Sequence, residues 1–349
     1  MTYLQPHHRL ALLMHGGTQQ PNRGKTGLAM LRYSPAPIVA VIDYAAADLT
    51  LEEVTGIDKP IPLVPSVQAA LAYGPEVLAI GIAPSGGRLP DPWFAEVEQA
   101  VRAGLSIVNG LHTPMACHAA LTPWLGPQQW IWDVRQEPPG LTVGTGQASQ
   151  LPCKRILTVG TDMSVGKMST TLELHRACLG LGLRSKAIAT GQTHLMLGDD
   201  GVALDAVRVD YASGAVEALM MRYGLDHDLL FIEGQGSLLN PSSTATLPLL
   251  RGSQPTHLVL VHRAGQTHIH NCPQVKIPDL NQVIQLYEQV TAAGGAFAPA
   301  RVVAIALNTG HLPPDQAAQA LQATQVATGL PCTDVFRYGA DPLLPGILG

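Results

Sequence analysis

The feature that most constrains this chain is a glycine-rich loop that joins a strand-like run to a helical pattern. Residues 154–159 read as a strand and run into the loop Gly160-Thr161-Asp162-Met163-Ser164-Val165-Gly166-Lys167, after which a helical pattern begins. Such a loop turns successive backbone N–H groups toward one point at a helix N-terminus, where a phosphate is favoured and a lysine can reach it. Five residues separate the two loop glycines, instead of the four of the standard pattern. The sequence therefore predicts a phosphate-binding loop.

Short β-branched runs alternate with longer helical patterns along the chain, which is typical of α/β proteins with parallel sheets. A polar stretch rich in Gly and Pro, residues 136–153, interrupts this alternation. We expect an N-terminal Rossmann-like domain over residues 1–145. We expect a C-terminal P-loop NTPase-like domain with a mainly parallel sheet over residues 146–349. The expected strands are Ile38–Ile42, Val77–Ile82, Ser106–Val108, Trp130–Val134, Ile156–Val159, Lys186–Ala189, Leu229–Ile232, Leu258–Val261 and Val302–Leu307.

Composition excludes several classes of function. The 21 basic and 26 acidic residues give a net charge of −5 without a basic block, so nucleic acid is not an expected partner. The longest stretch without Asp, Glu, Lys or Arg, residues 103–132, is broken by His and Pro and does not read as a membrane span. No signal peptide is recognisable, and the five scattered cysteines form no C-x-x-C pair. We expect a cytoplasmic protein with reduced thiols, a small-molecule substrate and a homo-oligomeric state as an option.

The loop resembles that of the dethiobiotin synthetases, GTDTxVGKT, including the spacing of five residues. Residues 230–239, LFIEGQGSLL, look like the acidic strand end and glycine turn of the same enzymes, which implies that Glu233 faces a metal beside the phosphates. Residues 304–308, AIALN, resemble the strand whose terminal Asn reads adenine. The resemblance implies cofactor contacts from Gly160, Thr161, Asp162, Ser164, Val165, Gly166, Lys167, Met168, Ser169 and Asn308.

One departure from that pattern affects the metal. In the synthetases a Thr follows the loop Lys and its hydroxyl binds Mg²⁺, whereas Met168 offers only a weak thioether acceptor. Ser169 and Thr170 lie about 100° and 200° further round the helix, so neither replaces the hydroxyl without distortion. Either Asp162 or Glu233 holds Mg²⁺, or the loop binds phosphates without hydrolysing them. ATP and acetyl-CoA both remain open as the cofactor.

Nearly the whole chain resembles the D-glutamate N-acetyltransferase-like family, long known only as a two-domain family of unknown function. The stretches that carry the resemblance are LRYS at 31–34 before VAVID at 39–43, GIAPSGG at 81–87, and VGTDMSVGKMST at 159–170. The resemblance implies acetyl transfer from acetyl-CoA to an amino acid. A phosphate loop without its magnesium hydroxyl would suit the phosphates of CoA.

Other candidate site residues follow predicted strands, where ligands of open parallel sheets bind. One group forms either a site for a small anion or carboxylate or an ordinary turn: Ser85, Gly86 and Gly87. A second group offers substrate contacts or a turn with satisfied hydroxyls: Thr190, Gln192 and Thr193. For acyl transfer, His194 or His262 is the candidate base, and the glycine-loop amides are candidate oxyanion donors.

Two further patterns are less specific. The spacing of four side chains permits a metal site, a polar rim or ordinary surface histidines: His262, His268, His270 and Cys272. The stretch from His15 to Thr26 resembles a second phosphate loop, but the spacing between Gly17 and Lys25 does not match the pattern and no helix start fits. We therefore expect a mobile polar loop from which Lys25 reaches a cleft between the domains.

The sequence thus predicts a P-loop enzyme that binds a phosphorylated cofactor and acts on a small amino acid or carboxylate. Its specific form would be acetyl-CoA-dependent N-acetylation of D-glutamate or a related amino acid. The alternatives are ATP-dependent carboxylate activation of the dethiobiotin-synthetase type and a nucleotide-responsive binding protein without turnover.

Overall fold

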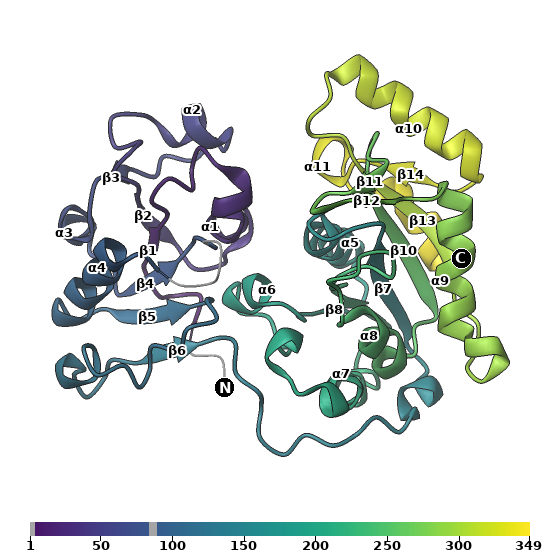
Figure 1. Ribbon diagram of the computed structural model, residues 1–349, viewed down its shortest axis with the longest axis horizontal. Helices are drawn as coiled ribbons and strands as arrows, with labels where there is room; N and C mark the ends of the chain where they lie inside the picture. Colours follow the sequence, from purple (N-terminus) through teal and green to yellow (C-terminus); the bar gives the residue numbers. More distant parts are fainter. Residues whose placement is uncertain (1–3, 84–88) are drawn as a thin grey trace. The chain divides into compact units, whose positions relative to one another are not determined.

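The computed structural model describes residues 4–83 and 89–349, and the chain divides into two compact units (Figure 1). The first unit comprises residues 1–136 with 192–203, and the second comprises residues 137–191 with 204–349. Each contains a six-stranded parallel sheet, which confirms the predicted α/β class. The domain boundary expected between residues 145 and 146 stays a prediction.

The sheet of the first unit has the strand order β3-β2-β1-β4-β5-β6, which is the order of a doubly wound Rossmann sheet. The direction in which strands are added reverses between β1 and β4. The strands are β1 (Leu10–Leu13), β2 (Ile38–Ile42), β3 (Leu63–Val64), β4 (Val77–Ile80), β5 (Ser106–Asn109) and β6 (Ile131–Asp133). The helices are α1 (Pro21–Tyr33), α2 (Leu51–Thr55), α3 (Val67–Ala70), α4 (Asp91–Arg102) and α6 (Gln192–Met196).

The second unit has the strand order β14-β13-β10-β7-β9-β8 and a separate antiparallel hairpin. The strands are β7 (Lys154–Gly160), β8 (Ser185–Ile188), β9 (Leu229–Ile232), β10 (His257–Arg263), β11 (His268–Ile269), β12 (Cys272–Lys276), β13 (Arg301–Asn308) and β14 (Cys332–Thr333). The helices are α5 (Lys167–Gly180), α7 (Val209–Tyr223), α8 (Thr246–Ser253), α9 (Leu280–Ala292), α10 (Pro314–Thr328), α11 (Val335–Tyr338) and α12 (Leu344–Leu348).

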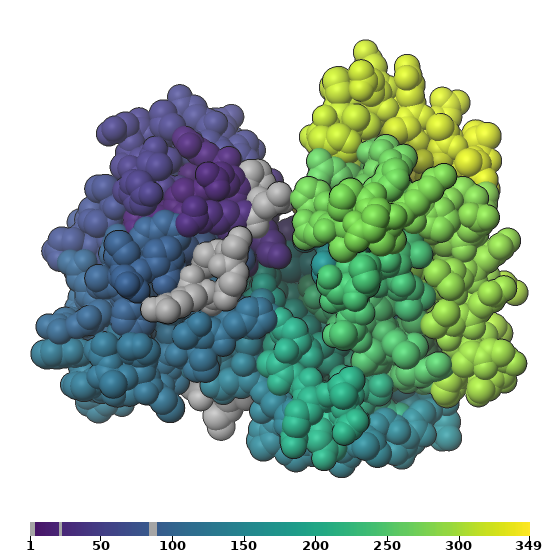
Figure 2. Space-filling view, in the orientation of Figure 1, coloured from purple at the N-terminus to yellow at the C-terminus, as the bar shows by residue number. Residues whose placement is uncertain are grey.

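Burial explains why the central strands of the second unit are continuous apolar runs. A parallel sheet covered on both faces has no solvent side, so its strands do not alternate between polar and apolar residues. Phe231 of β9 and Ile156 of β7 are fully buried in a cluster that also contains Leu174 of α5 and Ile347 of α12. The outermost helix α10, yellow in Figures 1 and 2, lies beside edge strand β14, and Ala317 is its buried residue.

The expectation of a mobile polar loop around residues 15–26 is wrong, because α1 begins at Pro21 and continues to Tyr33. Glycine lowers helix propensity, and this hid the helix from a reading of local preferences. Packing requires these glycines: a Cβ on Gly24 would lie 2.1 Å from the carbonyl oxygen of Gly17. A Cβ on Gly27 would lie 2.4 Å from the sulfur of Met14. Close approach of α1 to the end of β1 therefore overrides local propensity.

All five cysteines are free thiols, as expected. Across residues 4–83 and 89–349, no helix combines the length and the apolar character needed to cross a membrane.

Candidate functional site

The glycine-rich loop leaves the central strand β7 at Gly160 and enters α5 at Lys167. Two loop residues adopt left-handed backbone conformations, Ser164 with φ 58° and Gly166 with φ 119°. Alternation between left-handed and right-handed residues turns consecutive N–H groups to the same side and forms an anion-binding nest. No side chain caps the first N–H groups of α5. The backbone therefore has the form of the predicted phosphate-binding loop.

Lys167 is the cation of this loop, and its side chain is buried. Its Nζ donates a hydrogen bond of 2.8 Å to the backbone carbonyl oxygen of Asp162. Burial lowers the pKa of Lys167 to about 8, although the negative charges of Asp162 and Glu233 act in the opposite direction. A bound anion would restore the charge that burial disfavours.

Asp162 holds the loop to its surroundings and has no lone pair left for a metal. Its Oδ1 accepts hydrogen bonds from Met163 N–H at 2.7 Å and from the Asn240 amide at 2.8 Å. Its Oδ2 accepts from the Gln266 amide at 2.7 Å and from His270 N–H at 2.8 Å. A carboxylate offers about four acceptor positions, and all four are used here. Burial raises the pKa of Asp162, but these hydrogen bonds outweigh it and hold the pKa below its ordinary value.

Glu233 follows β9, the strand next to β7, and lies at the same sheet edge as the loop. Its Oε2 accepts hydrogen bonds from Thr190 N–H at 2.9 Å and Gly191 N–H at 3.1 Å. The Thr190 hydroxyl donates to the Glu233 carbonyl oxygen at 2.6 Å. Glu233 thus places a buried negative charge near Lys167 and joins the ends of β8 and β9.

The turn after Glu233 requires glycine at two positions. A Cβ on Gly234 would lie 1.7 Å from the carbonyl oxygen of Thr158. Gly236 has φ 69°, and a Cβ there would lie 1.7 Å from the Ser243 hydroxyl oxygen. The resemblance to a glycine turn therefore has a steric basis.

His262 and Tyr287 hold the start of the loop in place. His262 Nδ1 lies 2.8 Å from the Thr161 hydroxyl oxygen, and burial lowers the pKa of His262 to about 4. The Tyr287 hydroxyl donates to the Gly160 carbonyl oxygen at 2.7 Å and accepts from Leu238 N–H at 3.1 Å. Sequence reasoning missed Tyr287, because a tyrosine within an amphipathic helix resembles any other core residue.

The residues around the loop do not fit Mg²⁺. Met168 follows Lys167 on α5, and two hydroxyl groups further along the helix bond to its backbone: Thr170 to Gly166 O and Thr171 to Lys167 O, each at 3.0 Å. Of the two carboxylates predicted to hold Mg²⁺, Asp162 is fully engaged, and Glu233 accepts two backbone N–H groups on its Oε2. Within the described part of the chain, no three His, Cys, Asp or Glu side chains form a potential metal cluster.

The four residues whose spacing permits a metal site lie on and before the β11–β12 hairpin. His262 is buried in β10, whereas His268 and His270 are exposed on the hairpin and Cys272 is partly exposed. The backbone N–H of His270 donates to Asp162, so the hairpin is attached to the loop through its main chain. The hairpin is therefore held against the loop.

A pocket lies beside the N-terminus of α5, at the carboxyl ends of β10 and β13. Asn308 ends β13 and donates from Nδ2 to the Val165 carbonyl oxygen at 3.1 Å. The lining residues are Val165, Gly166, Thr170, Val261, Ala306, Leu307, Asn308, Asp334, Val335 and Phe336. The lining thus combines apolar side chains with the amide of Asn308, the hydroxyl of Thr170 and the carboxylate of Asp334.

The remaining predicted residues are distributed over both units. Thr190 lies beside Glu233 in the second unit, whereas α6 belongs to the first. Within α6, the Thr193 hydroxyl lies 3.0 Å from that of Thr26, and His194 Nε2 lies 2.9 Å from Asp199 Oδ2. His194 is fully buried. Gln192 packs against Gly110.

The predicted site of Ser85, Gly86 and Gly87 lies outside the described residues. The structure therefore brings together the loop residues 160–169 with Thr190, Glu233, His262 and Asn308. It does not group His194, Gln192 and Thr193 with them in the same unit.

Comparison with known proteins places this geometry in a family. Residues 142–344 match the P-loop domain of the DUF1611 family, described as a domain of unknown function, and residues 45–137 match its Rossmann-like N-terminal domain. The chain is 60% identical to a DUF1611 family protein from Anabaena variabilis of known crystal structure, with a TM-score of 0.96 over 98% of this chain and 99% of that one. These matches confirm the predicted Rossmann-like and P-loop domains.

Two curated relatives carry an enzyme name. A protein of Tritonibacter scottomollicae named D-glutamate N-acetyltransferase is 34% identical over 287 residues, which are 81% of this chain and 84% of the relative. A protein of the same name from a Pseudoalteromonas species is 33% identical over 285 residues, with the same coverage.

Proposed function

The chain belongs to the DUF1611 family, and on that premise we propose that it transfers an acetyl group from acetyl-CoA to the amino group of D-glutamate or a related acidic amino acid. Two relatives are named as D-glutamate N-acetyltransferases. The observation that carries the proposal is the phosphate loop of this chain, in which Lys167 is buried and Met168 stands where the standard loop has its magnesium-binding hydroxyl. A loop of this kind suits a ligand whose phosphates are held and not transferred. CoA is such a ligand.

The second unit would hold the cofactor. The loop N–H groups and Lys167 would bind its phosphates, because a nest and a buried ammonium both favour an anion. The pocket at Asn308 would take the adenine ring, with the exposed Phe336 at its wall. The side chains of Asp162 and Tyr287 hydrogen-bond to backbone groups of the loop and its surroundings, so we assign them as positioning residues.

Acetyl transfer to an amine requires a base for the ammonium proton and donors for the oxyanion that forms at the thioester carbonyl. Of the two candidate bases, His262 has its Nδ1 occupied by Thr161 and a pKa of about 4, which suits a positioning role. His194 has the imidazole–carboxylate arrangement of a base, with Asp199 orienting its ring. Because His194 is fully buried, this role requires movement of the α6 segment when substrate binds.

The competing proposal is ATP-dependent activation of a carboxylate. That reaction needs Mg²⁺ on the transferring phosphoryl group. The saturated Asp162 and the thioether of Met168 do not support such a site. A third option is a binding protein that holds a nucleotide without turnover.

A product assay separates the three. The purified chain is incubated with acetyl-CoA and D-glutamate, free thiol is followed with a chromogenic disulfide, and N-acetylglutamate is identified by mass spectrometry. We expect equal amounts of thiol and N-acetylated product, unchanged by EDTA. ADP formed from Mg-ATP only in the presence of a carboxylate would replace acetyl transfer with the ligase proposal. Nucleotide binding without any product would favour the binding protein.

A further inference from the structure

Arg23 is a cation of the first unit for which the proposed reaction has no role so far. It is the third residue of α1, which follows β1, and β1 and β4 flank the point where strand order reverses. Ligands of doubly wound sheets bind at the carboxyl ends of the strands at this point. The guanidinium carbon lies 4.4 Å from the centroid of the Trp93 ring on α4. A Cβ built on Gly16 would lie 3.6 Å from Nη1, so the guanidinium also borders the loop after β1.

The hydrogen-bond donors of this guanidinium are not used by the part of the chain that the structure describes. Its Nε is buried and has no hydrogen-bond partner there. A guanidinium over an aromatic ring can make this contact with its flat face and keep the N–H bonds in its plane available. A buried donor without an acceptor is unfavourable, so the arrangement indicates a missing acceptor.

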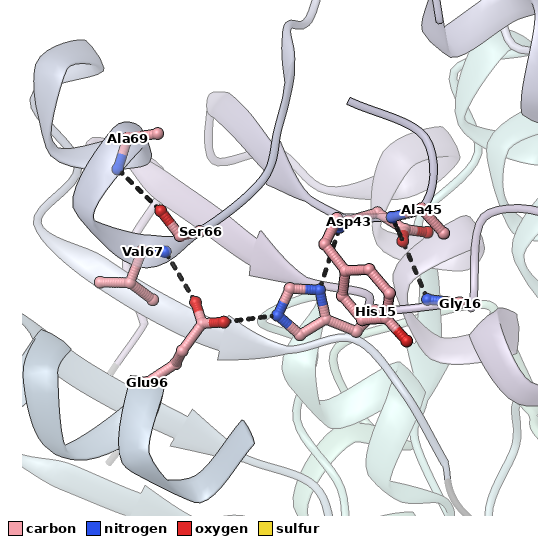
Figure 3. Close-up of polar contacts among 9 residues, drawn as sticks. His15, Gly16, Asp43, Ala45, Ser66, Val67, Ala69 and Glu96 are labelled. Atoms are coloured by element: carbon pink, nitrogen blue, oxygen red, sulfur yellow. Dashed lines mark hydrogen bonds and ion pairs between the residues drawn. The ribbon is translucent and has the colours of Figure 1, made fainter. Parts of the chain in front are cut away.

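Two acidic side chains of the first unit, Glu96 and Asp43, already have several hydrogen-bond partners each (Figure 3). Glu96 accepts from His15 Nε2 and from Val67 N–H, both at 2.7 Å. Burial raises the pKa of Glu96, but these hydrogen bonds outweigh it and keep the pKa below its ordinary value. Tyr44 N–H donates to His15 Nδ1 at 3.2 Å, so both nitrogens of the ring are engaged.

Asp43 is engaged in the same way. Its Oδ1 accepts from Gly16 N–H at 2.9 Å and Ala45 N–H at 3.1 Å, as Figure 3 shows. Its Oδ2 accepts from the backbone N–H and the hydroxyl of Thr18, at 3.3 and 2.5 Å. Asp43 and His15 thereby fix the loop after β1, and this loop forms one side of the space around Arg23.

The position of Arg23 in the helix also favours an added negative charge. The first turn of α1 contains no acidic residue, and its N-cap makes no side-chain hydrogen bond. The N-terminus of a helix carries partial positive charge, so a cation there is disfavoured unless an anion lies close by.

We propose that Arg23 binds a carboxylate of the substrate through its Nε–H and an Nη–H while its face stays stacked on Trp93. Side-on pairing of guanidinium with carboxylate uses two parallel N–H···O bonds in the plane of the group, which is the edge left available here. The ligand class is a small di- or monocarboxylate such as an acidic amino acid. This inference rests on the proposed function for the identity of that carboxylate, while the binding itself is measured without turnover.

Calorimetry on the full chain tests the proposal with D-glutamate and with glutarate, which keeps both carboxylates and lacks the amine. Arg102 is a matched control, because its guanidinium carbon lies 3.8 Å from the Trp124 centroid but its donors are occupied by Glu98. We expect R23Q to weaken binding about ten- to a hundredfold, R23K to weaken it less, and R102Q to leave it unchanged. Unaltered binding to R23Q, or no binding of either ligand to the wild type, overturns the proposal.

A chemical probe and a second titration complete the test. Glutarate should protect Arg23, but not Arg102, from phenylglyoxal, as read by peptide mass spectrometry; equal labelling with and without glutarate counts against the site. Acetyl-CoA is titrated into the same variants and should bind R23Q as it binds the wild type. Acetyl-CoA binding and acetyl transfer with no Arg23-dependent carboxylate binding would remove this inference alone. Arg23-dependent carboxylate binding without acetyl transfer would remove the proposed function alone.

Discussion

The hydroxyl of Tyr287 donates to the carbonyl oxygen of Gly160 across 2.7 Å and accepts from Leu238 N–H at 3.1 Å, so one buried atom joins the phosphate loop to the turn after Glu233. Tyr287 itself is fully buried, with 0% of its surface accessible. A helix side chain thus sets the position of two separate loops.

Removing this hydroxyl tests its positioning role. Tyr287→Phe should lower the free energy of unfolding by about 1–3 kcal/mol, because it leaves the buried Gly160 carbonyl and the partly buried Leu238 N–H without their partner. It should also weaken acetyl-CoA binding, because the loop loses its anchor. Urea unfolding and calorimetry measure the two effects, with Tyr73→Phe as a control at an exposed site. A loss of stability with unaltered acetyl-CoA affinity would limit Tyr287 to a structural role.

We expect Lys167 to destabilise the folded chain and to favour ligand binding. One substitution should therefore change stability and ligand affinity in opposite directions. Lys167→Met removes a buried cation. Burial lowers the pKa of this lysine from its ordinary value of 10.5 to about 8 in the folded chain. We expect a stabilisation on the order of 1–2 kcal/mol at pH 7, after allowing for the lost hydrogen bond to the Asp162 carbonyl oxygen. The same variant should bind acetyl-CoA at least about tenfold more weakly. Lys276→Met, at an exposed lysine, is the control. A loss of stability in Lys167→Met would show that burial of the lysine charge is not the dominant effect on stability.

The stabilisation in Lys167→Met should itself depend on pH. Between about pH 8 and 10.5 the unfolded chain keeps the lysine proton that the folded chain has released, so wild-type stability rises with pH in this range. The advantage of the variant should therefore be full below pH 8 and shrink above it. Acetyl-CoA binding should show the opposite trend in the wild type, weakening above about pH 8 because the anion requires protonated Lys167. A flat affinity profile from pH 7 to 10 in calorimetry would exclude Lys167 as the phosphate contact.

Asp162 should act as an anchor for the β11–β12 hairpin. Asp162→Asn keeps the shape but loses the charge and one acceptor atom, so the N–H of His270 and the amides of Asn240 and Gln266 cannot all be satisfied. Amide hydrogen exchange should become faster at His270 and along the hairpin, while Asp133→Asn in the first unit, where a carboxylate also holds backbone N–H groups, should leave the hairpin unchanged. If Asp162 were a metal ligand, EDTA would reproduce the effect of Asp162→Asn in the wild type, and we expect that it does not.

The sequence predicted those parts of the site that are local along the chain. Strand β7, the loop and α5 adjoin one another, and their periodicity and glycines carry the signal. The partners of Asp162 come from positions 78, 104 and 108 residues away, and Tyr287 lies 127 residues from Gly160. No local pattern encodes such contacts. The same holds for α1, whose glycines lower helix propensity but allow its close approach to the end of β1.

Met168 lies where the standard loop has its magnesium hydroxyl, and restoring that hydroxyl tests whether the loop has become a phosphate clamp. Met168→Thr places a hydroxyl directly after Lys167, at the first turn of α5. We expect ATP affinity to rise about three- to tenfold in the presence of Mg²⁺, with no change in EDTA, and acetyl-CoA affinity to stay within about twofold of the wild type. Met168→Leu is the control, because it changes the side chain without adding an oxygen. Strong magnesium-dependent ATP turnover in the wild type, lost in Glu233→Gln, would contradict the clamp and favour carboxylate activation.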